Sequence, residues 1–453
     1  MASGQDSQEL VRDIRERVAA DIPWIRSQLE RLIRIPSVSA DGFDPAHVRS
    51  SANATAEILS EAGLGDVRLL EIDGAHPAVF GELPGPPGSP TVLLYAHHDV
   101  QPPGDESLWI SPPFEPTERG GRLYGRGASD DKGGIAVHAA AIRAHEGSPP
   151  VGVKVVVEGE EEASSEHLPE FLTAYGRDLA ADVLVLADSS NWRIGVPALT
   201  TSIRGVLDCV VEVRTLDHAV HSGVFGGATP DALMALSRLL ATLHDDRGAV
   251  AIPGLEGSVP AEVDLPEETY RADAGVLQGV QLIGEGSITE RLWARPAVSI
   301  LGIDAPTVHD ASNQLVAMAR AKVSLRVPPG VQAQKARDAL VAHLESNAPW
   351  GARVAVTPGS MGEPFIVDAD GPLFDAVRRA FRDAWDHDPV DIGMGGSIPL
   401  VKAFADAYPE ATILLTGIED PDGRAHGENE SLHLGEFERA CVAEALLLSY
   451  AAG

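Results

Sequence analysis

Short apolar runs that end in a metal-binding type of side chain recur along this chain. Each run is rich in β-branched residues, which is typical of a buried strand. The histidine and carboxylate residues that end or follow these runs are His97, Asp130, Glu160, Glu161, Glu162, Asp188 and His426. In open α/β sheets the ligand crevice lies at the carboxyl ends of the strands, so we expect these side chains to converge. Two histidines and several carboxylates at one point suit a pair of divalent metal ions.

The periodicity of the apolar residues divides the chain into two kinds of structure. Residues 8–34 have helical spacing that ends before Pro36, and strand and helix patterns then alternate up to about residue 205. Residues 207–213 instead alternate apolar and polar side chains, as in a half-exposed antiparallel strand. A helix beginning near Thr229 and a strand, strand, helix pattern follow, which is typical of an α+β module.

These patterns predict an α/β fold in which one domain interrupts another. Near Pro358 the chain returns to a βα pattern, and it ends in a helix over residues 434–450. We therefore predict a catalytic domain with a mixed sheet flanked by helices, formed by residues 1–205 and 356–453. An inserted α+β domain, residues 206–355, would separate its two parts and has a normal domain size.

Composition excludes several classes of partner. The formal charge of −32 disfavours nucleic acid and anionic membranes, and no stretch of 18 apolar residues is present to span a bilayer. The first apolar segment carries several arginines in a helical pattern, unlike a secretory signal. The two cysteines, Cys209 and Cys441, fit a core strand and a helix face, which indicates buried thiols in a reducing cytoplasm.

Five short motifs lie in order along the chain. The motifs are Ala96–Val100 (AHHDV), Tyr124–Gly134 (YGRGASDDKGG), Glu158–Glu162 (EGEEE), His221–Gly227 (HSGVFGG) and Gly395–Pro399 (GGSIP). Together they resemble the co-catalytic metallopeptidases of the carnosinase, peptidase V, carboxypeptidase G and succinyl-diaminopimelate desuccinylase group. The last two look most like the dipeptidase and carnosinase branch. Each motif alone is weak, but several in family order are specific.

The resemblance implies a zinc-peptidase-like fold holding two metal ions, usually Zn²⁺, with Mn²⁺ or Co²⁺ possible. Its ligands would be His97, Asp130, Glu162, Asp188 and His426, with Asp130 bridging both ions. Asp99 would orient the ring of His97, and Glu161 would be the general base on a metal-bridging water. The alternative pair Glu160–Glu161 stays open, although alignment on Gly159 favours Glu161–Glu162. A cis peptide bond is expected between Asp130 and Asp131.

The resemblance also assigns the substrate contacts and the assembly. His221 of the inserted domain would stabilise the oxyanion in the site of a partner subunit, which implies a homodimer and makes the inserted segment a lid and dimerisation domain. Arg326, Asn313 and Ser397 match positions that contact the carboxylate and polar groups of the substrate. His98 should point to the opposite strand face and be structural.

Three functions remain open. The first is hydrolysis of dipeptides or short peptides, as a dipeptidase or small-peptide carboxypeptidase. The second is an amidohydrolase acting on N-acyl amino acids at the same dinuclear site, and the third is a non-catalytic binding protein on the same scaffold. Residues His221–Gly227 favour the dipeptidase.

Overall fold

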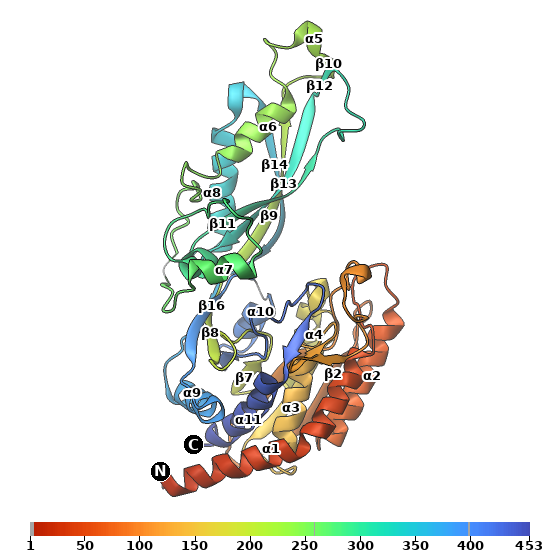
Figure 1. Cartoon of the computed structure of the whole chain (residues 1–453), viewed down its shortest axis with the longest axis vertical. Coiled ribbons are helices and arrows are strands. Elements are labelled where there is room, and N and C mark those ends of the chain that lie inside the picture. The colour runs from red at the N-terminus through yellow and green to blue at the C-terminus, as the bar shows by residue number, and fades with distance from the viewer. Residues whose placement is uncertain (1–3, 258, 397–398) are drawn as a thin grey trace. The chain divides into compact units, whose positions relative to one another are not determined.

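The computed structural model describes residues 4–257, 259–396 and 399–453, which form two compact units (Figure 1). Unit 1 comprises Met1–Thr201, Val367–Asp391 and Ala403–Gly453, and unit 2 comprises Ser202–Ile366 and Ile392–Lys402. The predicted α/β fold with an inserted α+β segment is confirmed. That the inserted segment acts as a lid and dimerisation domain stays a prediction.

Unit 1 is built on a six-stranded mixed sheet with the order β1-β2-β6-β3-β7-β17. Its strands are β1 (Gly65–Leu70), β2 (Ala78–Leu83), β3 (Thr91–His97), β6 (Gly152–Glu158), β7 (Val183–Leu186) and β17 (Thr412–Leu415). The strands β6, β3, β7 and β17 are parallel, whereas β1 and β2 pair in antiparallel fashion. The parallel strands are buried almost throughout, which explains why they read as continuous apolar runs.

Helices cover this sheet. They are α1 (Gly4–Ile33), α2 (Pro45–Glu61), α3 (Lys132–Ala144), α4 (Leu168–Leu179), α9 (Pro372–Trp385) and α11 (Leu434–Tyr450). α3 packs against β3, α1 and α11, while α2 packs against β1 and β2. The predicted first and last helices are confirmed. Asp131 caps α3, since its side chain accepts a hydrogen bond from the Gly134 N–H.

Short sheets and helices complete the fold. They are the sheet of β4 (Thr117–Arg119), β5 (Arg122–Tyr124) and β18 (Ser431–His433), the sheet of β8 (Ala198–Ile203), β15 (Phe365–Ile366) and β16 (Val390–Met394), the turn η2 (Glu161–Ala163), and α10 (Pro399–Ala407). The small β4-β5-β18 sheet joins residues about 300 positions apart, because Ser431 pairs with Tyr124 and His433 with Arg122.

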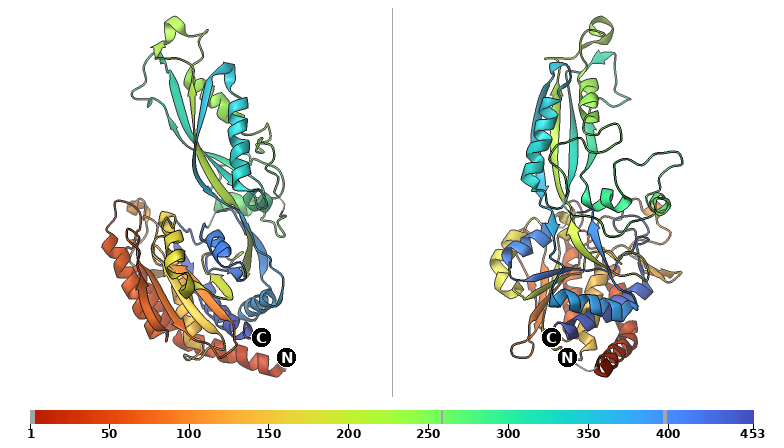
Figure 2. Two further views of the ribbon diagram at one scale, coloured as in Figure 1. Left: turned by 180° about the vertical axis from the view of Figure 1, so that it is seen from behind. Right: turned by 90° about the vertical axis from the view of Figure 1, so that its left-hand side faces the viewer.

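Unit 2 is a four-stranded antiparallel sheet with two helices packed along it (Figure 2). Its main elements are β9 (Gly205–Arg214), α6 (Ala232–Ala241), β11 (Ala297–Asp304), β13 (Met318–Val327), α8 (Ala333–Ser346) and β14 (Arg353–Gly362). β9 alternates buried and partly exposed residues as predicted, and its buried residues share a core with α6 and α8. The predicted helix near Thr229 begins slightly later than expected, because Asp231 is its N-cap.

Beyond the sheet, unit 2 carries a two-stranded ribbon and short helices. These are β10 (Val220–His221), α5 (Ser222–Phe225), α7 (Glu267–Asp273), η3 (Glu290–Ala294) and β12 (Gln314–Leu315). β10 pairs with β12, so the segment around His221 lies beside the segment around Gln314.

The state of the two cysteines and the apolar content of the helices complete the description of the fold. Cys209 and Cys441 are free and buried, as predicted. Across the described residues, no helix is both long enough and apolar enough to cross a bilayer.

Candidate metal centre and active site

The parallel strands of unit 1 carry histidine and carboxylate residues at their carboxyl ends. His97 is the last residue of β3, and Glu161 and Glu162 follow β6 in η2. Asp188 follows β7, and Glu419 follows β17. Because parallel strands end at the same edge of a sheet, these side chains come together there. The apolar runs predicted this convergence for all of them except Glu419.

Two further candidate ligands reach this edge from loops. Asp130 lies between β5 and α3, and His426 lies between β17 and β18. The expectation that Asp130 ends a buried strand is therefore wrong. The strand β5 stops at Tyr124, and the chain then turns through Gly127, whose φ is +80°. The peptide bond between Asp130 and Asp131 is cis, as predicted.

Six side chains form two neighbouring groups with the spacing of metal ligands. The groups, within each of which one ligand atom per residue lies within 4.8 Å of the others, are His97, Glu161 and Asp188, and Asp130, Glu162 and His426. Asp130 stands between the two imidazoles, with Oδ1 3.0 Å from His97 Nε2 and Oδ2 2.9 Å from His426 Nε2. One carboxylate that faces both histidines has the arrangement of a bridging ligand.

Asp99 contacts both His97 and the turn that carries the two glutamates. The Nδ1 atom of His97 lies 3.2 Å from the backbone oxygen of Asp99 and 3.4 Å from its Oδ1. The carboxylate of Asp99 also accepts hydrogen bonds from the backbone N–H groups of Glu161 and Glu162, at 3.3 and 3.0 Å, and from Ser39 Oγ at 2.7 Å. Asp99 therefore fixes the η2 turn as well as the imidazole.

The acidic triplet divides into one structural residue and two that face the site. Glu160 accepts hydrogen bonds from the backbone N–H groups of His76 and His167 and contacts the His167 ring. Its carboxylate is thus occupied outside the two ligand groups, whereas Glu161 and Glu162 each belong to one. This geometry favours the pair Glu161–Glu162 over Glu160–Glu161.

Burial and mutual repulsion perturb the carboxylates of the site. Burial, with the charge of Asp130, raises the pKa of Glu162 to about 7, and burial raises the pKa of Asp188 to about 6. Burial and the charge of Asp188 raise the pKa of Glu161 well above its ordinary value. The hydrogen bond to Asp130 is the main cause that raises the pKa of His426 to about 9. Several buried carboxylates so close together require cations to offset their mutual repulsion.

Comparison with known proteins identifies the family. The sequence profile of "Peptidase family M20/M25/M40" matches residues 93–449. A cysteinylglycine-S-conjugate dipeptidase of Corynebacterium striatum is 38% identical over 400 residues, which is 86% of this chain and 88% of that protein. The chain belongs to peptidase family M20/M25/M40. The predicted resemblance is thus confirmed.

Further relatives of this M20 enzyme are also dipeptidases. The Beta-Ala-His dipeptidase of Rattus norvegicus is 31% identical over 376 residues, covering 79% of this chain and 76% of that protein. The crystal structure of human carnosine dipeptidase 1 matches with a TM-score of 0.79 and 26% identity, covering 98% of this chain and 99% of that chain. The dipeptidase Dug1p of Saccharomyces cerevisiae shares the fold, with a TM-score of 0.80 at 24% identity over 98% of both chains.

The donor set of the M20 chain fits divalent metal ions. Each ligand group combines one imidazole nitrogen with carboxylate oxygens, which are donors that zinc, manganese and cobalt accept. Both thiols lie outside the site, in β9 and α11. The residues therefore suit a dinuclear centre without sulfur ligands.

Sequence reasoning missed two acidic residues of this site. An oxygen of Glu419 lies within 4.8 Å of ligand atoms of Asp130 and Asp188, and Ser190 donates a 2.9 Å hydrogen bond to Glu419. Its position just after the apolar run of β17 was the signal that could have found it. Glu430 accepts hydrogen bonds from the loop that carries Asp130 and has no comparable local signal.

The predicted substrate contacts of unit 2 fall in two separate places. His221 is exposed and its Nδ1 accepts a 3.0 Å hydrogen bond from the Gly223 N–H, while the Asn313 backbone oxygen accepts one from the Ser222 N–H. Arg326 lies at the other end of β13, where it pairs with Val206. Ser397 lies outside the described residues.

Arg326 and Arg204 form a pair of guanidinium groups that have no acidic partner among the described residues. Arg204 is 8% exposed and donates to the backbone oxygens of Gly395, Arg291 and Arg295. Burial and then the charge of Arg326 lower the pKa of Arg204 to about 10. Two neighbouring guanidinium groups without a carboxylate partner among the described residues have the chemistry to bind an external anion.

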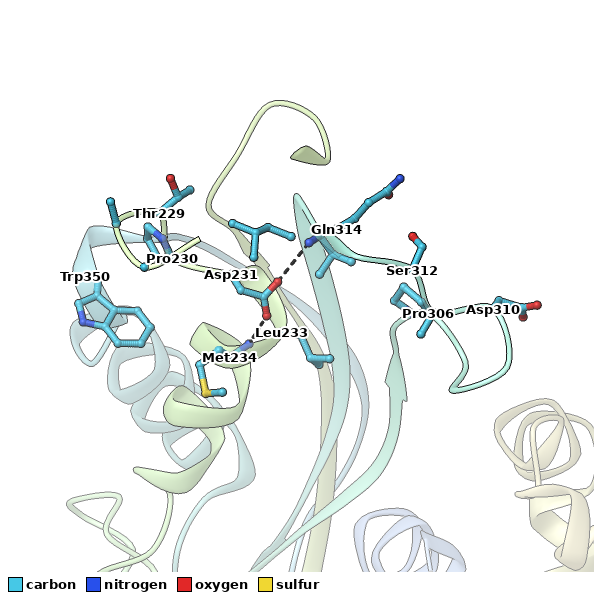
Figure 3. A pocket seen from close by; sticks show the side chains of 15 residues that line it. Thr229, Pro230, Asp231, Leu233, Met234, Pro306, Asp310, Ser312, Gln314 and Trp350 are labelled. Carbon is cyan, nitrogen blue, oxygen red and sulfur yellow. Dashed lines mark hydrogen bonds between the residues drawn. The ribbon is translucent and has the colours of Figure 1, made fainter. Parts of the chain in front are cut away.

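A cavity of about 970 Å³ opens elsewhere in unit 2 (Figure 3). Its lining includes Trp350, Met234 and Asp231. The oxygens of Asp231 accept hydrogen bonds from the N–H groups of Met234 and Val316, at 3.0 and 3.1 Å. That carboxylate is therefore a helix cap, and we assign the cavity no catalytic role.

Proposed function

We propose that this M20 chain hydrolyses the peptide bond of unblocked dipeptides in a metal-dependent reaction. The observation that carries the proposal is the bridging arrangement of Asp130 between His97 and His426. The dipeptidases described above are relatives across most of the chain, and they favour a peptide substrate over an N-acyl amino acid.

The metal ions would be held by residues from both ligand groups. His97 and Asp188 would hold one ion, Glu162 and His426 the other, and Asp130 both. We propose zinc as the resident metal. Bound ions of this kind supply Lewis acidity and lower the pKa of a water molecule.

Glu161 is the proposed general base. Among the described residues no side chain or backbone group donates a hydrogen bond to its carboxylate, and that carboxylate lies beside His97 and Asp188. Its raised pKa suits a group that takes a proton from water and returns it to the leaving amine near neutral pH. Glu162, the next residue in the chain, would serve as a metal ligand instead.

Substrate recognition is proposed to use the guanidinium groups of Arg204 and Arg326. Arg326 would bind the terminal carboxylate of the dipeptide, and Asn313 and Ser397 would contact its polar groups. An Arg326→Met variant should lower kcat/KM for a dipeptide by about 10–100-fold, the loss of a hydrogen bond to a charged group. Turnover of the corresponding dipeptide amide, measured in parallel, should change far less. An equal loss on both substrates would assign Arg326 a purely structural role.

The proposed assembly is a homodimer in which His221 and Asn313 act in the partner's site. β9 separates the His221 segment from Arg326, because Arg326 pairs with Val206 at its start and His221 follows its end. From Val206 to Arg214 a strand extends about 26 Å, whereas an extended dipeptide spans roughly 7 Å. One substrate molecule cannot touch both ends of one unit 2, so the two ends would serve two different sites.

A substrate panel tests the proposed activity. Purified protein reloaded with zinc or manganese should hydrolyse Cys-Gly, β-Ala-His and other unblocked dipeptides, and should act far more slowly on N-acetyl and N-succinyl amino acids. Faster release of acetate or succinate than of free amino acids from dipeptides would instead support the amidohydrolase. No turnover of either class with both metals bound would support a binding protein.

A further inference from the structure

One buried carboxylate accepts several hydrogen bonds from the loop that carries Asp130. The Glu430 side chain is fully buried, and its Oε1 accepts hydrogen bonds from the backbone N–H groups of Ser129 and Asp130, at 3.1 and 3.3 Å. The Ser129 hydroxyl donates to the same oxygen at 3.2 Å. Its Oε2 accepts from the Gly127 N–H at 2.9 Å and from Arg126 Nη1 at 2.7 Å. Glu430 thus orients the backbone that presents Asp130.

Arg126 connects the same carboxylate to the segment that carries His426. Its Nη2 donates to the backbone oxygens of His426 and Pro102, each at 3.2 Å. Arg126 is 1% exposed, so the ion pair with Glu430 is shielded from water. Glu430 itself lies four residues after His426 and also accepts, through its backbone oxygen, from the Gly125 N–H.

A network of this kind acts on metal binding through geometry. A buried ion pair adds little net stability, but donors that converge on one carboxylate leave the backbone a single arrangement. The two ligands concerned, Asp130 and His426, lie about 300 residues apart in sequence and meet within 2.9 Å. Partners that hold ligands in place typically change metal affinity by 10–100-fold.

We propose that Glu430 is a positioning residue of the metal centre. Together with Arg126 it holds the segments of Asp130 and His426 in the positions from which both side chains can bind a metal ion. It therefore sets the affinity for the ion that Asp130, Glu162 and His426 would share. The inference rests on the proposed dinuclear site and concerns binding of the metal rather than turnover.

A matched variant distinguishes a role of Glu430 in metal binding from a purely structural role. Glu436 is equally buried and accepts hydrogen bonds from the Gly195 N–H at 3.1 Å, from Trp385 Nε1 at 2.7 Å and from Arg439 Nη1 at 2.5 Å. None of these partners belongs to a ligand segment. Glu436→Gln should therefore lower the melting temperature as Glu430→Gln does, without the same effect on the metal.

The test is a zinc titration of the metal-stripped full-length chain against a chromophoric chelator, with melting temperature recorded for each variant. The wild type should bind two ions. In Glu430→Gln the dissociation constant of the ion held by Asp130, Glu162 and His426 should rise by about 10–100-fold, and that of the other ion, which shares only Asp130 with this network, should rise less. Glu436→Gln should match the wild type in both constants.

A milder variant keeps the test decisive if Glu430→Gln does not fold. Ser129→Ala removes one hydrogen bond to Oε1 and buries no unpaired charge, and it should raise the same dissociation constant by about 2–10-fold. Unchanged affinities in the folded Glu430 or Ser129 variant would overturn the inference, and so would an equal loss in Glu436→Gln. Two zinc ions with no dipeptide turnover would instead refute the proposed function and leave the role of Glu430 intact.

Discussion

Replacing Glu161 with glutamine should lower turnover of a dipeptide by about 10²–10⁴-fold, the usual contribution of a general base. The amide has nearly the same shape but cannot accept the proton of the attacking water. Glu161 lies in the ligand group of His97 and Asp188, and none of the described residues donates a hydrogen bond to its carboxylate. Steady-state rates should fall while elemental analysis still finds two metal ions.

Glu160→Gln is the matched control for this experiment. Glu160 accepts hydrogen bonds from the backbone of His76 and His167, so its replacement should lower the melting temperature. The value of kcat should fall far less than in Glu161→Gln. A collapse of kcat in Glu160→Gln together with near-normal rates in Glu161→Gln would transfer the base to Glu160.

Replacing His221 with alanine should lower kcat by about 10²–10³-fold, or about 2.7–4 kcal/mol, the cost of losing one oxyanion donor. The ring is exposed, and its Nδ1 already accepts the Gly223 N–H, which leaves Nε2 to act on a ligand. Metal content should not change, because His221 belongs to unit 2 and all proposed ligands belong to unit 1. Rates and zinc content of the purified variant check both parts.

Mixing the two inactive chains tests whether His221 acts across a dimer. In a heterodimer of His221→Ala and Glu161→Gln, one hybrid site would have both an intact Glu161 and an intact His221. Partial recovery of activity is expected in heterodimers purified by two different tags. Heterodimers as inactive as either parent would show that His221 serves its own chain or no site.

The sequence predicted the part of the site that parallel strands supply. His97 and Asp188 follow continuous apolar runs, and the ends of parallel strands necessarily meet at one edge of the sheet. The same rule also led to Glu161 and Glu162 after β6. It could not assign the acidic triplet, because the direction of Glu160 depends on donors from His76 and His167.

Loop residues lay beyond the reach of periodicity. Asp130 and His426 come from loops beside the small sheet, so the apolar runs before them named these residues but gave no physical reason for them to reach the strand ends. Arg126 stood in a family motif without an assigned role and Glu430 carried no signal, since their role arises from hydrogen bonds between segments about 300 residues apart. Contacts of this kind become visible only in the folded chain.

The most direct test of the dinuclear site is the metal content of fully active protein. Metal-stripped chain should show no dipeptidase activity, and activity should return on titration with zinc or manganese and level off at two ions per chain. Elemental analysis of the reloaded enzyme should give the same number. Full activity with one ion per chain, or activity that survives complete removal of metal, would contradict the account.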